Sequence, residues 1–235
     1  MRPTEMPGIS AEYRALGALL EAHRLDRARG AVMKLEGEET GSVYFVISGW
    51  LAVSKSLHEG QRQIVDIVLP GEFLDPGSAN ARTSAVEIES LSQVAVAVLA
   101  REDWARLLQG YPELRRRFDR DTAAAVSRMS ERMLRLGKGA TESRIAYALC
   151  ELCLRVSELG LVRDSAFHIP MTQQQLGDLA GLSAVHVCRT LRRFSRHGVI
   201  KVADHMDIRI LDLDALAEIA EIDPAALQNE IITAA

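Results

Sequence analysis

Three closely spaced arginines lie in one short stretch of the chain that otherwise has the pattern of two helices. Residues 171–194 read MTQQQLGDLAGLSAVHVCRTLRRF. Thr172 followed by Gln175 has the spacing of a capping box, which predicts a helix that begins there. Gly181 permits a tight turn, and Ser183 is placed to cap a second helix, which carries the arginines. Two helices joined by a short turn with glycine form a helix-turn-helix, whose second helix enters the major groove of DNA.

The second predicted helix separates an apolar face from a basic one. Val187, Leu191 and Phe194 recur at i, i+4 and i+7, which is the spacing of a buried face. Residues 183–201 contain no Asp or Glu and five basic residues: Arg189, Arg192, Arg193, Arg196 and Lys201. Because a basic face attracts phosphate, this asymmetry favours nucleic-acid binding over an ordinary solvated surface.

Segments on either side of this stretch suggest the elements that must position it. VIKV at 199–202 and DIRIL at 207–211, joined by residues 203–206, predict a hairpin wing. Upstream, residues 142–159 read as a helix and residues 167–169 as a short strand. The predicted unit is therefore a helix-turn-helix flanked by a helix and a small sheet.

The chain before residue 110 has a different pattern, with short apolar runs separated by glycines. Four of these runs are rich in β-formers: VYFVISG, WLAVSKS, QIVDIVL and QVAVAVL. Short strands at regular spacing predict an antiparallel sandwich or barrel. The pattern then turns helical, with a short helix over 103–109 and a long one that opens at Tyr111-Pro112.

One stripe of the long predicted helix is suited to contact a second helix. Its members step by three or four residues: Phe118, Thr122, Ala125, Met129, Met133 and Leu136. A stripe this narrow predicts a dimer seam. Packing against the chain's own β domain is the alternative, and the two can hold on different faces of the helix. Gly137-Lys138-Gly139 is the predicted boundary after it, because two glycines can absorb a bend.

Composition sets the protein among ordinary globular chains. The 235 residues are 48% hydrophobic and 26% charged, with a net charge of -4, so any basic surface must be local. Apolar runs such as VAVAVLA are far shorter than a membrane span, and MRPTEMPGISAEYR lacks the apolar segment of a signal peptide. Three cysteines are too few for a secreted disulfide framework. We therefore expect a cytoplasmic protein with no membrane partner.

The cysteines and histidines do not predict a metal or haem site. Cys150 and Cys153 have CxxC spacing, but no second pair completes a four-ligand set. Both lie in the apolar segment YALCELCL, which favours buried core thiols. His23 and His58 are expected at the surface. We assign no cofactor.

The order of these segments resembles the Crp/Fnr family of bacterial transcription regulators over nearly the whole chain. The segments are VYFVISGWLAVSK, LPGEF, TSAVEIES, a long helix, ESRIAYAL and MTQQQLGDLAGLSAVHVCRTLRRFSRHGVI. The resemblance implies an α+β fold. Its parts would be a cyclic-nucleotide-binding-like β jelly roll over 1–110, a dimerisation helix over 111–137 and a winged helix-turn-helix over 138–213. Residues 214–235 are left as an acidic helical extension.

The resemblance also implies how the protein works. It would be a homodimer that binds a palindromic operator in double-stranded DNA and contacts RNA polymerase. The family's base-reading positions align with Ala184, Val185 and Arg189, with His186 as a further candidate. Residues expected on phosphates are Thr172, Gln173, Ser183, Arg192 and Arg193.

The sensory site departs from the members that bind cyclic AMP. Where those members carry Gly-Glu for the ribose, this chain reads Asp75-Pro76-Gly77. Their Arg-Ser pair for the phosphate aligns with Thr83-Ser84, and Arg82 stands one residue early, which reverses its face in a strand unless a bulge restores it. Their two adenine-contacting hydroxyls align with Met129 and Ser130, so one remains. Cyclic AMP is therefore not the predicted effector, and the sequence names no other.

Two further features invite regulatory interpretations. Cys188 precedes Arg189, and cationic neighbours favour a thiolate, so oxidation there would bring bulk and charge near phosphate; a merely tolerated small residue is the alternative. Residues 204–235 hold eight acidic residues against Arg209 alone: Asp204, Asp207, Asp212, Asp214, Glu218, Glu221, Asp223 and Glu230. This segment is either a solvated extension or a restraint on non-specific DNA binding.

Other classes of protein fit the sequence less well. GxSxG, HExxH and Walker patterns are absent from it, so an enzyme is not predicted. A small-molecule-binding regulatory module whose main partner is another protein would account for the β domain alone. It leaves the acid-free basic helix and its wing without a role.

Overall fold

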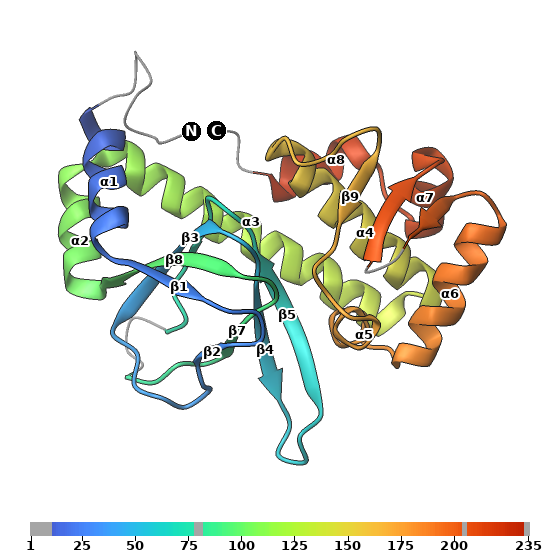
Figure 1. Ribbon diagram of the computed structural model, residues 1–235, viewed down its shortest axis with the longest axis horizontal. Coiled ribbons are helices and arrows are strands. Elements are labelled where there is room, and N and C mark those ends of the chain that lie inside the picture. The colour runs from blue at the N-terminus through green and yellow to red at the C-terminus, as the bar shows by residue number, and fades with distance from the viewer. Residues whose placement is uncertain (1–10, 78–81, 204–205, 233–235) are drawn as a thin grey trace. The chain divides into compact units, whose positions relative to one another are not determined.

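The computed structural model describes residues 11–77, 82–203 and 206–232, with side chains from residue 16 onward. The described residues do not include Ala81, which precedes Arg82 of the sensory site. They also do not include Asp204 and His205, which join the two strands of the predicted wing. The chain divides into two compact units (Figure 1). The first is Met1–Lys55 with Ile67–Asp121, and the second is Ser56–Asp66 with Thr122–Ala235.

Two four-stranded sheets contain the strands predicted before residue 110. The first has the order β1 (Arg24–Arg27), β8 (Val94–Ala100), β3 (Ser42–Ser48) and β6 (Phe73–Leu74). The second has the order β2 (Val32–Lys34), β7 (Glu87–Ser90), β4 (Leu51–Ser56) and β5 (Arg62–Val68). Strands β3 and β8 run antiparallel with Tyr44 opposite Val98, and β4 pairs antiparallel with β7, so the predicted antiparallel pairing is confirmed.

Helices cover one end of the first sheet and build an aromatic core there. They are α1 (Ala11–Ala22), α2 (Arg101–Gly110) and the start of α3 (Pro112–Lys138). Trp104 is buried, with its ring centroid 4.6 Å from that of Phe73 and 5.4 Å from that of Phe118. Phe118 thus packs against the chain's own β domain, which is the alternative the sequence left open for part of the α3 stripe.

The middle of α3 presents an apolar face outward. Thr122, Val126, Met129 and Met133 are exposed, and Met133 reaches 71%. Ala125 is half-buried. Leu136, the last member of the predicted stripe, is also half-buried. The predicted dimer seam stays a prediction, and Val126, which the sequence did not single out, is exposed beside it.

The second unit contains the predicted winged helix-turn-helix. Its helices are α4 (Thr141–Glu158), α5 (Gln173–Ala180), α6 (Ala184–Arg196), α7 (Leu213–Ala220) and α8 (Pro224–Ile231). Its three-stranded sheet has the order β10 (Ile200–Val202), β11 (Asp207–Ile210) and β9 (Ala166–His168). Antiparallel pairing of β10 with β11 confirms the wing. No helix in the described part of the chain combines the length and apolarity that a bilayer crossing needs.

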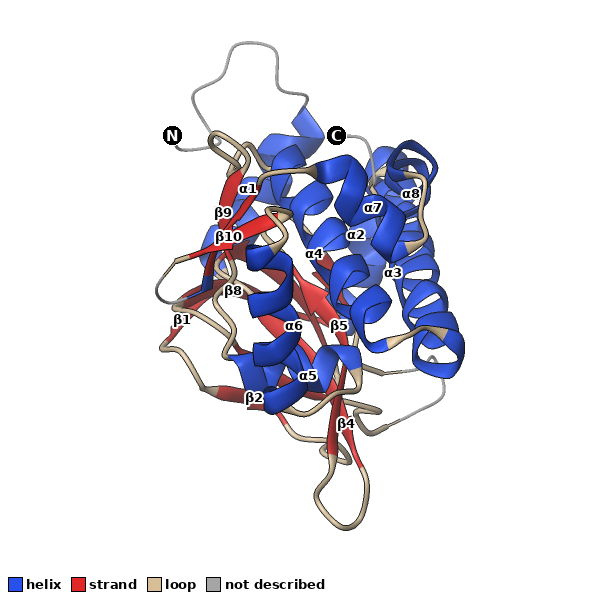
Figure 2. Cartoon of the chain, turned by 90° about the vertical axis from the view of Figure 1, so that its right-hand side faces the viewer, coloured by secondary structure: helices blue, strands red, loops and turns tan. Residues whose placement is uncertain are grey.

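The acidic extension is part of the folded unit rather than a solvated appendage. Helices α7 and α8 pack against α4 (Figure 2). Leu216 and Ile231 are buried, and Asp212 and Asp223 cap the two helices by accepting backbone N–H bonds. Truncation after Leu213 would therefore remove core side chains. Substitution of exposed acids is the cleaner test of the predicted restraint on non-specific binding.

A cluster of charged side chains lies in the core of the second unit. Asp66 on β5 accepts from Arg128 Nη2 at 2.8 Å and from Arg132 Nη1 at 2.7 Å. Glu151 on α4 accepts from Arg132 Nε at 3.0 Å and from Arg155 Nη1 at 3.0 Å. All five residues are buried, and Glu151 has no exposed surface. Arg128 and Arg132 of α3 thus serve as internal partners of buried carboxylates.

Protonation of Asp66 at low pH is expected to lower the stability of the protein. Burial alone would raise the pKa of this carboxyl, but attraction to Arg128 and Arg132 outweighs burial and holds the pKa well below its ordinary value of 3.8. A carboxyl whose pKa is lower in the folded protein than in the unfolded chain stabilises the fold at pH values above its unfolded pKa. This contribution is lost as the pH falls through the pKa of the folded state.

Below about pH 4, the urea midpoint of the wild type should therefore fall more steeply with pH than that of Asp66→Asn, which has no carboxyl to protonate. Urea unfolding followed by circular dichroism at several pH values measures both slopes. Equal slopes would show that Asp66 is not linked to folding.

Candidate nucleic-acid interface

Local hydrogen bonds fix the geometry of the two-helix motif as the sequence predicts. The Thr172 hydroxyl accepts from the Gln175 backbone N at 3.1 Å, and the Gln175 side chain accepts from the Thr172 backbone N at 2.9 Å. This is the predicted capping box. Ser183 caps α6 by accepting from the backbone N of His186.

Two glycines allow the tight turn between α5 and α6. Gly181 ends α5 in the left-handed conformation, with φ of 65°. A Cβ added at Gly177 would lie 2.4 Å from the carbonyl oxygen of Leu182, so the turn passes against α5 where only glycine fits. These contacts fix the start of α6 relative to α5.

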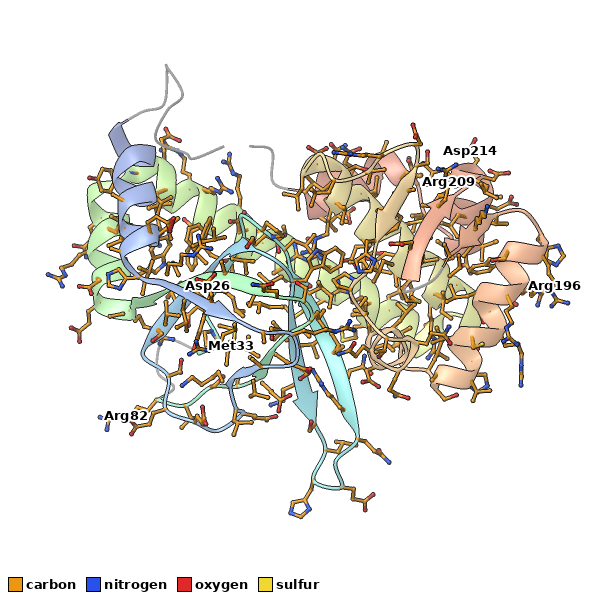
Figure 3. All side chains as sticks on the ribbon, in the orientation of Figure 1. Asp26, Met33, Arg82, Arg196, Arg209 and Asp214 are labelled. Carbon is orange, nitrogen blue, oxygen red and sulfur yellow. The ribbon has the colours of Figure 1, made fainter. Side chains whose placement is uncertain are left out.

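The two faces of α6 divide as the sequence indicates. Val187, Leu191 and Phe194 are buried, and Thr190 joins them, which the apolar pattern did not show. The outer face carries the basic and base-reading candidates, all exposed: Val185, His186, Arg189, Arg192, Arg193, Arg196 and His197. Arg196 projects outward from α6 in Figure 3. The helix can therefore present Val185, His186 and Arg189 to a groove while its other face stays in the core.

The predicted phosphate-contacting residues lie at the starts of the two helices and on the outer face of α6. Thr172 and Ser183 are exposed N-caps, and Gln173 is half-buried at the first position of α5. Backbone N–H groups at a helix start favour anions, which suits such a role. Arg189, Arg192 and Arg196 form no ion pair with any part of the chain that the structure describes.

Arg193 differs from the other arginines of α6 because it has an acidic partner. Its guanidinium donates to the carboxylate of Glu142, in the first turn of α4. A groove of about 630 Å³ runs between the start of α4 and α6. Its lining comprises Thr141, Glu142, His186, Arg189, Thr190, Arg193, Arg196 and His197. Residues 183–201 contain no acid, but Glu142, which precedes Arg193 by 51 residues in the chain, lies beside the outer face of α6.

The residues at the sensory positions are either bonded within the chain or exposed. The Asp75 carboxylate pairs with Arg101 and accepts from the Gly77 backbone N at 3.1 Å. Arg82 is exposed and extends outward from its loop in Figure 3. The buried Ser84 hydroxyl donates to the Val86 carbonyl oxygen at 2.6 Å. The side chains of Asp75 and Ser84 therefore have partners within the chain, whereas that of Arg82 points away from it.

The adenine-contacting positions retain one hydroxyl. Ser130 donates it to the Val126 carbonyl oxygen at 2.9 Å, and Met129 is exposed. The hydroxyl that remains is thus engaged by the helix backbone.

The three cysteines occupy different environments. Cys150 is buried, which raises the pKa of its thiol to about 12 and keeps it protonated. Burial also raises the pKa of Cys153, which is half-buried. Cys188 is half-buried on α6, and its redox role stays a prediction. Within the described residues, no group of three or more His, Cys, Asp or Glu side chains is arranged to hold a metal ion.

Comparisons with known proteins match both units. Residues 143–219 match the family model described as a Crp-like helix-turn-helix domain, and residues 26–111 match the cyclic nucleotide-binding domain. The transcriptional activatory protein AadR of Rhodopseudomonas palustris is 30% identical over 185 residues, 77% of this chain and 76% of that protein.

Two further comparisons extend over most of the chain. The nitrogen fixation regulation protein FixK of Bradyrhizobium diazoefficiens is 29% identical over 197 residues, 83% of this chain and 81% of that protein. The solved structure of FixK2 from Bradyrhizobium japonicum shares the fold, with a TM-score of 0.70 at 22% identity over 90% of this chain and 98% of that one. Together with the geometry of α5 and α6, these matches show that the chain belongs to the Crp/Fnr family of transcription regulators, which act by binding DNA rather than by catalysis.

Proposed function

We propose that this regulator acts as a homodimer on a two-fold symmetric operator in double-stranded DNA, and that it does so without cyclic AMP. The observation that carries the proposal is the outer face of α6, where Arg189, Arg192 and Arg196 are exposed on a helix whose opposite face is buried. Free guanidinium groups on a rigid helix suit both phosphate and guanine contacts. Contact with RNA polymerase is part of the proposal through the family.

The exposed stripe of α3 supports the dimer. Val126 is 54% exposed and Met133 is 71% exposed, whereas residues of that size are usually covered when they line one helix face. The same stripe on a second copy would cover them, and a two-fold pair of α3 helices would present two α6 helices to successive major grooves. An operator for such a dimer consists of two inverted half-sites.

The operator is tested by selecting bound duplexes from a random pool with the purified full-length protein. We expect inverted half-sites that each contain a guanine read by Arg189, with centres about 10 base pairs apart or a multiple of that. Enrichment of single, unpaired half-sites would contradict the dimer. If every sequence were retained equally, specific DNA recognition itself would be excluded.

Cyclic AMP is expected to leave operator affinity unchanged. Asp75 is engaged by Arg101, and Arg82 is exposed, so neither the ribose nor the cyclic phosphate meets the partners used by cyclic-AMP-binding members. Fluorescence anisotropy with the selected operator measures the dissociation constant with and without the nucleotide. A gain in affinity that depends on cyclic AMP would contradict this prediction. A regulator of this kind would be controlled by another effector or by its own abundance.

A further inference from the structure

Glu142 is the acid that faces the basic surface of α6. It lies in the first turn of α4, its side chain is 35% exposed, and its carboxylate accepts from Arg193, which is 55% exposed. His186, Arg189 and Arg196 line the same groove. Since residues 183–201 contain no Asp or Glu, the negative charge here comes from α4.

We propose that Glu142 competes with DNA phosphate for Arg193 and thereby lowers the affinity of the protein for DNA of any sequence. The inference rests on the proposed DNA-binding function and concerns the regulation of that same surface. A carboxylate and a phosphate oxygen both accept from a guanidinium fork, so Arg193 cannot use the same donors for both. The Glu142 pair must open before Arg193 reaches the backbone of DNA.

The exposure of the pair makes such an exchange feasible. Exposed ion pairs are weak because water and salt screen them, so a phosphate can displace the carboxylate. Once displaced, Glu142 still carries a negative charge close to the phosphate, which adds repulsion. Both effects reduce binding without regard to base sequence, since phosphate contacts carry no direct sequence information.

The pair contributes little to holding α4 and α6 together. The two helices are in contact, and each buries apolar side chains in the core of the unit, such as Ile145 on α4 and Val187 on α6. Removing the charge of Glu142 should therefore leave the fold intact. This separates a role in DNA affinity from a structural one.

Glu142→Gln tests the proposal, with Glu158→Gln as the matched control. Glu158 ends the same 18-residue helix, is exposed, and contacts Gln228 of α8. Both variants remove one negative charge from α4, but only Glu142→Gln removes the partner of Arg193. Dissociation constants are measured by anisotropy for the selected operator and for a scrambled duplex across a range of salt concentrations.

We expect Glu142→Gln to bind both duplexes about 3- to 10-fold more tightly and to show a steeper salt dependence, by roughly one phosphate contact per protomer. Glu158→Gln should change affinity less than about 2-fold. In an Arg193→Ala background, the gain from Glu142→Gln should be much smaller than in the wild type, because the competition for Arg193 is gone and only the repulsion of phosphate by Glu142 remains.

Three results would overturn the proposal while the DNA-binding function stands. They are equal effects of the two glutamine variants, weaker binding by Glu142→Gln, and a gain of the same size with and without Arg193. Weaker binding would mean that Glu142 orients Arg193 or contacts DNA itself. If the wild type selected no operator and bound no duplex even at low salt, the proposed function would fail with it.

Discussion

Replacing Glu151 with alanine is expected to lower the free energy of unfolding by about 3–5 kcal/mol. Glu151 has no exposed surface and accepts from two buried arginines, Arg132 and Arg155. The variant would leave these guanidinium groups in the core with one acid fewer, and the desolvation of each charge would no longer be offset. Because Arg132 also binds Asp66, the whole cluster should loosen.

Urea unfolding at neutral pH measures this loss, provided that the dependence of the free energy on urea is similar for wild type and variant. Glu158→Ala is the matched control, since Glu158 is exposed on the same helix and accepts a hydrogen bond from Gln228 at the surface. We expect the control to stay within about 0.5 kcal/mol of the wild type. If the two variants lost similar amounts of free energy of unfolding, the buried ion pairs of Glu151 would contribute no more to stability than the surface contact of Glu158.

Arg189→Ala is expected to weaken operator binding by about 1–3 kcal/mol per half-site and to relax the preference at one base pair. The Arg189 side chain is exposed on the outer face of α6, and its planar fork matches the O6 and N7 acceptors of guanine. Val185 and His186 flank this position and are exposed as well. Val185 has no polar group, so it suits apolar contact with a thymine methyl.

Arg193→Ala is the comparison that separates base reading from phosphate contact. It should weaken binding to operator and scrambled duplex by similar factors and flatten the salt dependence. Anisotropy titrations with both duplexes, and with operators changed at single base pairs, measure the difference. If Arg189→Ala lowered affinity equally for operator and scrambled DNA, Arg189 would not be the residue that reads a base.

The elements of the helix-turn-helix could be predicted from the order of the residues. The capping box of Thr172 and Gln175, the turn at Gly181 and the cap at Ser183 all follow from hydrogen bonds or backbone angles within four residues. The buried face of α6 follows from helical periodicity. Such local interactions hold in any fold that contains the helix, so the residue order predicts them.

The pairing of charged residues that are distant in sequence depends on the tertiary fold. Glu142 and Arg193 are 51 residues apart, and Asp66 reaches Arg128 from 62 residues away. Charged residues on α3 look alike in sequence, yet Arg128 and Arg132 are buried, whereas Arg120 is exposed. The difference depends on which side of the helix β5 and α4 occupy, and no local pattern encodes that placement. The buried ion pairs of Asp66 and Glu151 are part of the core, and breaking them costs stability. The exposed pair of Glu142 and Arg193 can instead exchange with DNA phosphate.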